Sequence, residues 1–125
     1  MDKAQALHNF WNSYGLTAYD ENSLPSGDKK PECPYLTYSV STGSIGDILM
    51  LSGSLWYRST SWQEIQKKAD QIAADIGYGF KIVPIDGGYM SITKGTPFAQ
   101  RMADDSDDMI RRILININVE FLTEY

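Results

Sequence analysis

The C-terminal part of the chain carries the pattern that most restricts the fold, a period-two alternation of apolar residues. Large apolar residues occupy every second position, and the residues between them are mostly polar. The apolar set is Ile113, Ile115, Ile117, Val119 and Phe121, and the polar set is Asn116, Asn118 and Glu120. Because successive side chains of a strand point to opposite faces, the pattern predicts a strand over Met109–Leu122 with one face buried against a core.

Two amphipathic helices are predicted from apolar residues that recur every three or four positions. Residues 2–14 carry Ala4, Leu7, Trp11 and Tyr14, and Gly15 follows as a C-cap. The segment from Ser61 to Glu64 fits a capping box, in which each side chain bonds a backbone amide of the other residue. The second helix then runs to Gly77 with one apolar stripe. That stripe consists of Trp62, Ile65, Ala69, Ile72, Ala73 and Ile76.

Four further strands are predicted as two hairpins, one joined by residues 42–46 and the other by the tight turn at 86–88. These strands are Tyr35–Ser41, Ile48–Arg58, Phe80–Ile85 and Tyr89–Lys94. The order of elements predicts an α+β fold: a mainly antiparallel sheet of about five strands with two helices packed on one face. With 125 residues, of which 42% are hydrophobic, the chain fits a single domain over 1–125 with one core.

Two long polar segments remain between these elements, residues 16–34 and Gly95–Asp108, and both are expected to be loops. The first holds three of the five prolines, and the second holds an acidic run. Long loops in compact domains are often functional or mobile, so both segments are candidates for contact with other molecules.

Composition excludes several classes of function. The net charge is −5, and the 11 lysines and arginines are scattered, which argues against a nucleic-acid-binding face. The lone cysteine, Cys33, cannot form an internal disulfide, so the chain fits a reducing cytoplasm. We find no secretion signal and no apolar run of about 18 residues, and therefore expect neither export nor a membrane span.

Catalysis is not expected, because no nucleophile lies beside a base and no glycine-rich phosphate loop is present. The single histidine, His8, lies next to the apolar stripe of the first helix and is expected to be a packing or surface residue. A reactive thiolate at Cys33 has only Lys29 and Lys30 to support it. We predict a protein that is not an enzyme, with no catalytic residue, no cofactor and no metal site.

The acidic run Asp104, Asp105, Asp107 and Asp108 allows two interpretations. Converging carboxylates bind hard cations such as Ca²⁺, but the run lacks the glycine and the distal glutamate of a calcium loop. The simpler interpretation is a solvated turn in which aspartates and Ser106 bond local backbone amides. Arg111 and Arg112 follow directly, and they would neutralise this charge within one subunit or across to a neighbour.

The aromatic segment Trp56-Tyr57-Arg58 ends the predicted strand before the second helix. Trp56 either packs under that helix as core or faces a partner as an interface anchor. The chain holds fifteen aromatic residues, and tyrosine and tryptophan are enriched at protein interfaces. Core packing with scattered surface tyrosines explains the same count.

Three segments together resemble the small tail terminator (tail completion) proteins of long-tailed bacteriophages and prophages of Gram-positive bacteria. They are "ALHNFWNSYGL", "SLWYRSTSWQEI" and "GTPFAQRMADDSDDMIRRILININVEFLTE", which occur in order along the chain. The resemblance implies a structural virion protein that forms a ring, usually hexameric, on the head-proximal end of the tail tube. Such a ring stops tube polymerisation and provides the surface for head–tail joining.

The resemblance also implies partners and interface residues. The partners are further copies of the chain, the tail tube protein and a head-completion or neck protein, while DNA only passes through the lumen. The expected location is the virion tail or neck, and the host cytoplasm during assembly, with no membrane contact. Candidate interface residues are Thr96, Pro97, Phe98, Gln100, Arg101, Asp104, Asp105, Asp107, Asp108, Arg111, Arg112, Trp56, Tyr57 and Arg58. The negative charge would help DNA pass without adhering.

Two alternatives remain open from the sequence. One is another phage ring protein, either a head-completion or a tail tube protein. The other is a small soluble binding module or enzyme subunit, with a pocket between the Ser61–Ile76 helix and the sheet.

Overall fold

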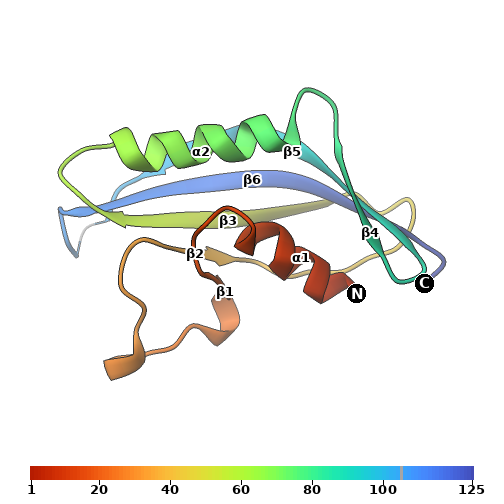
Figure 1. Ribbon diagram of the computed structural model, residues 1–125, viewed down its shortest axis with the longest axis horizontal. Helices are drawn as coiled ribbons and strands as arrows, with labels where there is room; N and C mark the ends of the chain where they lie inside the picture. The colour runs from red at the N-terminus through yellow and green to blue at the C-terminus, as the bar shows by residue number, and fades with distance from the viewer. Residues whose placement is uncertain (105) are drawn as a thin grey trace.

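The computed structural model describes residues 1–104 and 106–125 and shows an α+β fold built on one curled sheet (Figure 1). The six strands lie in the order β1-β2-β3-β6-β5-β4, and only the β1–β2 pair is parallel. The strands are β1 Ala18–Asp20, β2 Tyr35–Tyr38, β3 Leu49–Arg58, β4 Lys81–Ile85, β5 Gly88–Met102 and β6 Ile110–Thr123. The helices are α1 Lys3–Asn12 and α2 Gln63–Ile76.

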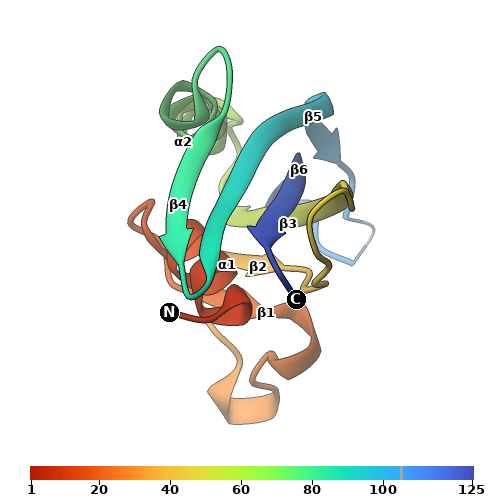
Figure 2. The same ribbon diagram turned by 90° about the vertical axis from the view of Figure 1, so that its right-hand side faces the viewer.

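Both helices pack on the same face of the sheet, called the inner face below (Figure 2). The alternating apolar residues of β6 are all buried there, as the period-two pattern predicts. The apolar stripe of α2 meets them through Ile65, Ala69, Ile72 and Ile76. The predicted α+β fold, the two helices on one face and the last strand are therefore confirmed.

Gly53 lets α1 approach β3 closely. A Cβ atom on Gly53 would lie 2.9 Å from two ring atoms of Trp11, which is fully buried. Ordinary contacts of this kind are 3.4 Å or longer, so only glycine leaves room for the indole. Gly53 is therefore a point of close approach between α1 and β3.

The sheet differs from the prediction in two places. Part of the predicted 16–34 loop forms β1, which adds a sixth strand, and its parallel pairing with β2 makes the sheet mixed. The sequence did not predict β1 because three residues are too few to show an alternation. The predicted loop at Gly95–Asp108 is also partly wrong, since β5 continues to Met102. An irregularity in the pairing between Lys94 and Ala99 shifts the register with β6. The apolar alternation is interrupted there, so the sequence does not predict the second half of the strand.

The predicted capping box of α2 is wrong. Trp62 occupies the N-cap position and makes no side-chain cap bond, while the Ser61 hydroxyl accepts from the amide of Gln63 at 3.1 Å. A capping box instead begins α1, where Asp2 and Gln5 bond each other's amides. Among the described residues, no helix is both long enough and apolar enough to cross a lipid bilayer.

Candidate functional site: a cleft at the acidic end of the sheet

An aromatic row crosses the outer face of the sheet, away from the helices. Tyr35 of β2 stacks on Trp56 of β3 with 6.0 Å between ring centroids and 13° between planes. On the other side of Trp56, the guanidinium of Arg112 lies 4.8 Å from the indole centroid. The Trp56 Nε1 donates to Thr37 Oγ1 at 3.0 Å. The interpretation of Trp56 as core under the second helix is therefore wrong, because its neighbour Leu55 takes the inner face.

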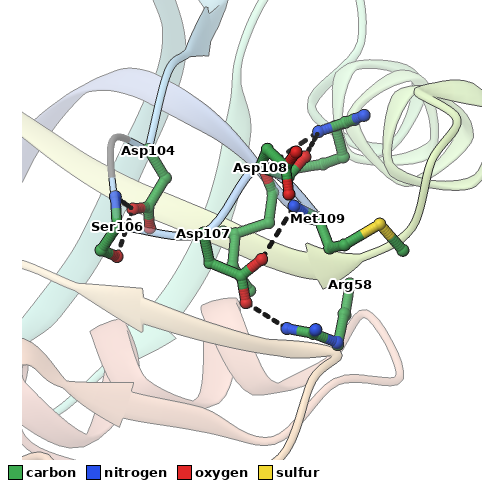
Figure 3. A network of polar contacts seen from close by, with 8 residues as sticks. Arg58, Asp104, Ser106, Asp107, Asp108 and Met109 are labelled. Atoms are coloured by element: carbon green, nitrogen blue, oxygen red, sulfur yellow. Dashed lines mark hydrogen bonds and ion pairs between the residues drawn. The ribbon is translucent and has the colours of Figure 1, made fainter.

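The acidic turn that precedes β6 is organised by its own carboxylates (Figure 3). Asp104 accepts from the amide and hydroxyl of Ser106 at 2.9 and 2.6 Å. Asp107 accepts from the amide of Met109 at 2.9 Å and pairs with Arg58. These local bonds match the predicted solvated turn. Asp105, which belongs to the predicted interface set, lies outside the described residues.

These bonds keep the carboxylates ionised. The Ser106 hydroxyl and amide hold the pKa of Asp104 below its usual value. The Met109 amide, followed by Arg58, does the same for the pKa of Asp107. The expected neutralisation by Arg111 and Arg112 is found in part. Arg112 contributes to the lowered pKa of Asp104, whereas the residue that pairs with Asp107 is Arg58, 49 positions away.

A cleft of about 490 Å³ lies between this turn, the aromatic row and the loop before β2. The loop contributes Lys30, Pro31, Glu32 and Cys33; the strands contribute Tyr35, Trp56, Arg58 and Ile110; and the turn contributes Asp104, Ser106 and Asp107. The two long polar segments singled out in the sequence thus meet at one site. The sequence did not predict that the cleft residues preceding Trp56 in the chain belong to the same site as Trp56. Only the pairing of β2 with β3 places Tyr35 beside Trp56.

A second cluster lies on the inner face at the same end of the sheet. The guanidiniums of Arg101 and Arg111 lie 4.9 and 5.4 Å from the ring centroid of Trp62. Arg101 donates to Gln66 Oε1 at 3.2 Å. Arg111 donates to the backbone oxygens of Asp108 and Thr60 at 2.6 and 3.2 Å.

The remaining predicted interface residues are spread over the structure. Phe98 and Tyr57 are half-buried and pack against the core. Thr96 and Pro97 are exposed at the irregular part of β5, where the carbonyl of Pro97 accepts from Asn116 at 2.9 Å. Gln100 and Asp108 are also exposed. The structure therefore brings together the aromatic and acidic candidates and leaves the 96–100 segment apart from them.

The two residues with possible chemistry have ordinary surroundings. The Nδ1 of His8 lies 2.9 Å from the hydroxyl of Tyr38, so His8 is a partly buried packing residue. Burial raises the pKa of the Cys33 thiol, while Arg58 and Lys30 act in the opposite direction. A raised pKa reduces the thiolate fraction, so a reactive Cys33 is not favoured.

The cleft combines an aromatic wall with carboxylates and cations, which suits ion pairing and stacking against another molecule. It contains no histidine, since the only one in the chain is His8. Comparison of the chain with known protein families, curated proteins and solved structures finds no match.

Proposed function

We propose that this chain is a structural protein of a bacteriophage tail, a terminator that caps the head-proximal end of the tail tube. Copies would join in a ring, six in number as in the family that the sequence resembles. The ring stops addition of tube subunits and offers its other side to a head-completion or neck protein. In this proposal the protein acts by contact and transforms no substrate.

The observation that carries the proposal is the uncovered outer face of the sheet. The helices cover only the inner face, and the outer face exposes Met50 (77%), Ile48 (60%) and Tyr89 (52%). Ile82 and Phe80 of the β4 region are exposed as well. These apolar side chains lie among the polar residues Asn118 and Glu120 of β6, so the outer face is a mixed surface, and protein interfaces are commonly mixed in this way. A ring subunit needs contact surfaces of this kind for its neighbours and for the tube.

The alternative of a ligand-binding module is less well supported. It expects a pocket between α2 and the sheet, but that space is filled by buried side chains such as Ile65, Ile72 and Ile115. The cleft of about 490 Å³ lies on the other face, between two polar loops. Its mixed ionic and aromatic lining is suited to a protein segment.

Deletion of the gene from the phage or prophage tests the proposal. Without a terminator, tube growth has no stop, so electron microscopy should show overlong tails that lack heads. Complementation with the intact gene is the control. Tails of normal length joined to heads would contradict the proposal. Tails of normal length that stay separate from heads would favour the head-completion alternative instead.

A further inference from the structure

We propose that Arg101 and Arg111, stacked on Trp62, form a carboxylate-binding surface that receives Asp104 and Glu32 in the cleft of a second copy of this chain. This inference rests on the proposed function and names the contact between neighbouring copies. It accounts for two surfaces of opposite charge on which Arg101, Arg111, Asp104 and Glu32 form no ion pair within the described residues.

The basic surface, formed by Arg101 and Arg111 on Trp62, is held in a fixed arrangement and has no carboxylate partner within the described residues. No carboxylate lies within 4.0 Å of the guanidinium of Arg101 or Arg111 among the described residues. Their hydrogen bonds go to neutral oxygens, and the Nε of Arg111 is buried with no partner in that same part of the chain. Stacking on Trp62 fixes both planar groups, and a fixed guanidinium loses less entropy when it binds a carboxylate. Arg101 is exposed and supplies the accessible charge.

The cleft is the complementary surface. Its lining carries three carboxylates, Glu32, Asp104 and Asp107, against the two cations Lys30 and Arg58. Arg58 already pairs with Asp107. Asp104 is bonded to Ser106, and neither Asp104 nor Glu32 has an ion pair within the described residues. Arg112, stacked on Trp56, helps to lower the pKa of Asp104 without forming an ion pair with it. Asp104 and Glu32 are therefore the carboxylates available to a guanidinium that enters the cleft.

The positions of the two surfaces favour a head-to-tail contact. Both lie at the end of the sheet where β5 passes into β6, but Trp62 and Arg101 are on the inner face, whereas Asp104 and Trp56 are on the outer face. In Figure 1 the start of α2 lies above this end of the sheet, and the turn before β6 lies below it. Because the basic surface and the cleft lie on opposite faces of the sheet, they cannot contact each other within one copy. In the proposed contact, the inner face of one copy therefore meets the outer face of the next. Contacts of this type close into a ring when the rotation between copies permits it.

Two charge reversals test the contact. Arg101→Glu makes the inner surface acidic, and Asp104→Arg makes the cleft basic; both residues lie at solvent-accessible positions. Sedimentation velocity over a wide range of protein concentration measures self-association. We expect the wild-type chain to self-associate less as salt rises, and each variant alone to lose about tenfold or more in association constant. An equimolar mixture of the variants should recover association, because the introduced carboxylate of one copy then meets the introduced guanidinium of the next.

Matched controls separate this contact from general charge effects. Lys94→Glu and Glu124→Arg make the same charge changes at exposed positions away from both surfaces and should associate as the wild type does. Thermal unfolding of each variant confirms folding. Three results would each overturn the inference: a wild-type chain that stays monomeric at every concentration, single variants that associate normally, or a mixture that recovers nothing. Charge-swapped assembly without binding to tail tubes would remove the proposed function and leave this contact standing.

Discussion

Substitution of Gly53 by alanine tests how α1 is seated on the sheet. The added methyl group would lie 2.9 Å from two atoms of the Trp11 ring and 3.1 Å from a third. Trp11 is fully buried and packs edge-on against Phe10 with centroids 4.9 Å apart, so the indole cannot move aside freely. Overpacking of this kind costs about 1–3 kcal/mol.

Part of that cost is offset, because replacing glycine in a strand interior contributes about 0.5–1 kcal/mol in chain entropy. The net loss in free energy of unfolding then lies between roughly 0 and 2.5 kcal/mol, and its central value of about 1 kcal/mol lowers Tm by roughly 3–6 °C for a domain of this size. Thermal unfolding followed by circular dichroism measures this. Gly79→Ala is the matched control, since a Cβ there meets nothing within 4 Å.

A double-mutant cycle shows whether Trp11 is the cause. In a Trp11→Phe background the smaller ring leaves space, so Gly53→Ala should cost little or stabilise the protein. The reasoning is refuted if Gly53→Ala behaves like Gly79→Ala, or if the loss is as large without the indole. Either result would mean that α1 does not press on β3 at Gly53.

Two further predictions concern single polar contacts. The Met109 amide and Arg58 hold the pKa of Asp107 in the folded protein below its usual value of 3.8. The Asp107 carboxylate therefore stabilises the fold at pH values above its pKa in the unfolded chain, and this stabilisation is lost as the pH falls through its pKa in the folded protein. Tm of Asp107→Asn should therefore lie below that of the wild type at neutral pH and converge with it in acid; a gap that persists in acid contradicts this. Tyr14 donates to Asp75 at 2.7 Å, so Tyr14→Phe should cost about 0.5–1.5 kcal/mol by chemical denaturation. Tyr19→Phe is its control, because the Tyr19 hydroxyl has no hydrogen bond within the described residues, and equal losses would contradict the assignment.

The elements predicted correctly are those whose burial is periodic over many residues. Strand β6 alternates through five inward positions, and α2 repeats every three or four residues, so the core dictates their sequence. Strand β1 has three residues and pairs in parallel with β2, a contact that no local pattern shows. The second half of β5 follows Thr96-Pro97, where the pairing with β6 breaks and the alternation with it.

The candidate site was predicted in part for a similar reason. The sequence identified both long polar segments and the aromatic pair Trp56-Tyr57 as candidates for contact with other molecules. It did not predict that the two segments meet at one cleft. Neighbouring strand residues point to opposite faces, and which of the two faces the helices cover depends on the whole sheet. The Arg58–Asp107 pair joins residues from separate elements, so only the three-dimensional fold reveals it.

Negative-stain imaging of the purified protein with growing tail tubes shows directly whether the chain caps a tube. We expect added protein to form a ring on one end of each tube and the tubes to stop lengthening there, whereas Arg101→Glu protein should fail to form the ring. Tubes that lengthen equally with and without the protein, with no density at their ends, would contradict the proposed function.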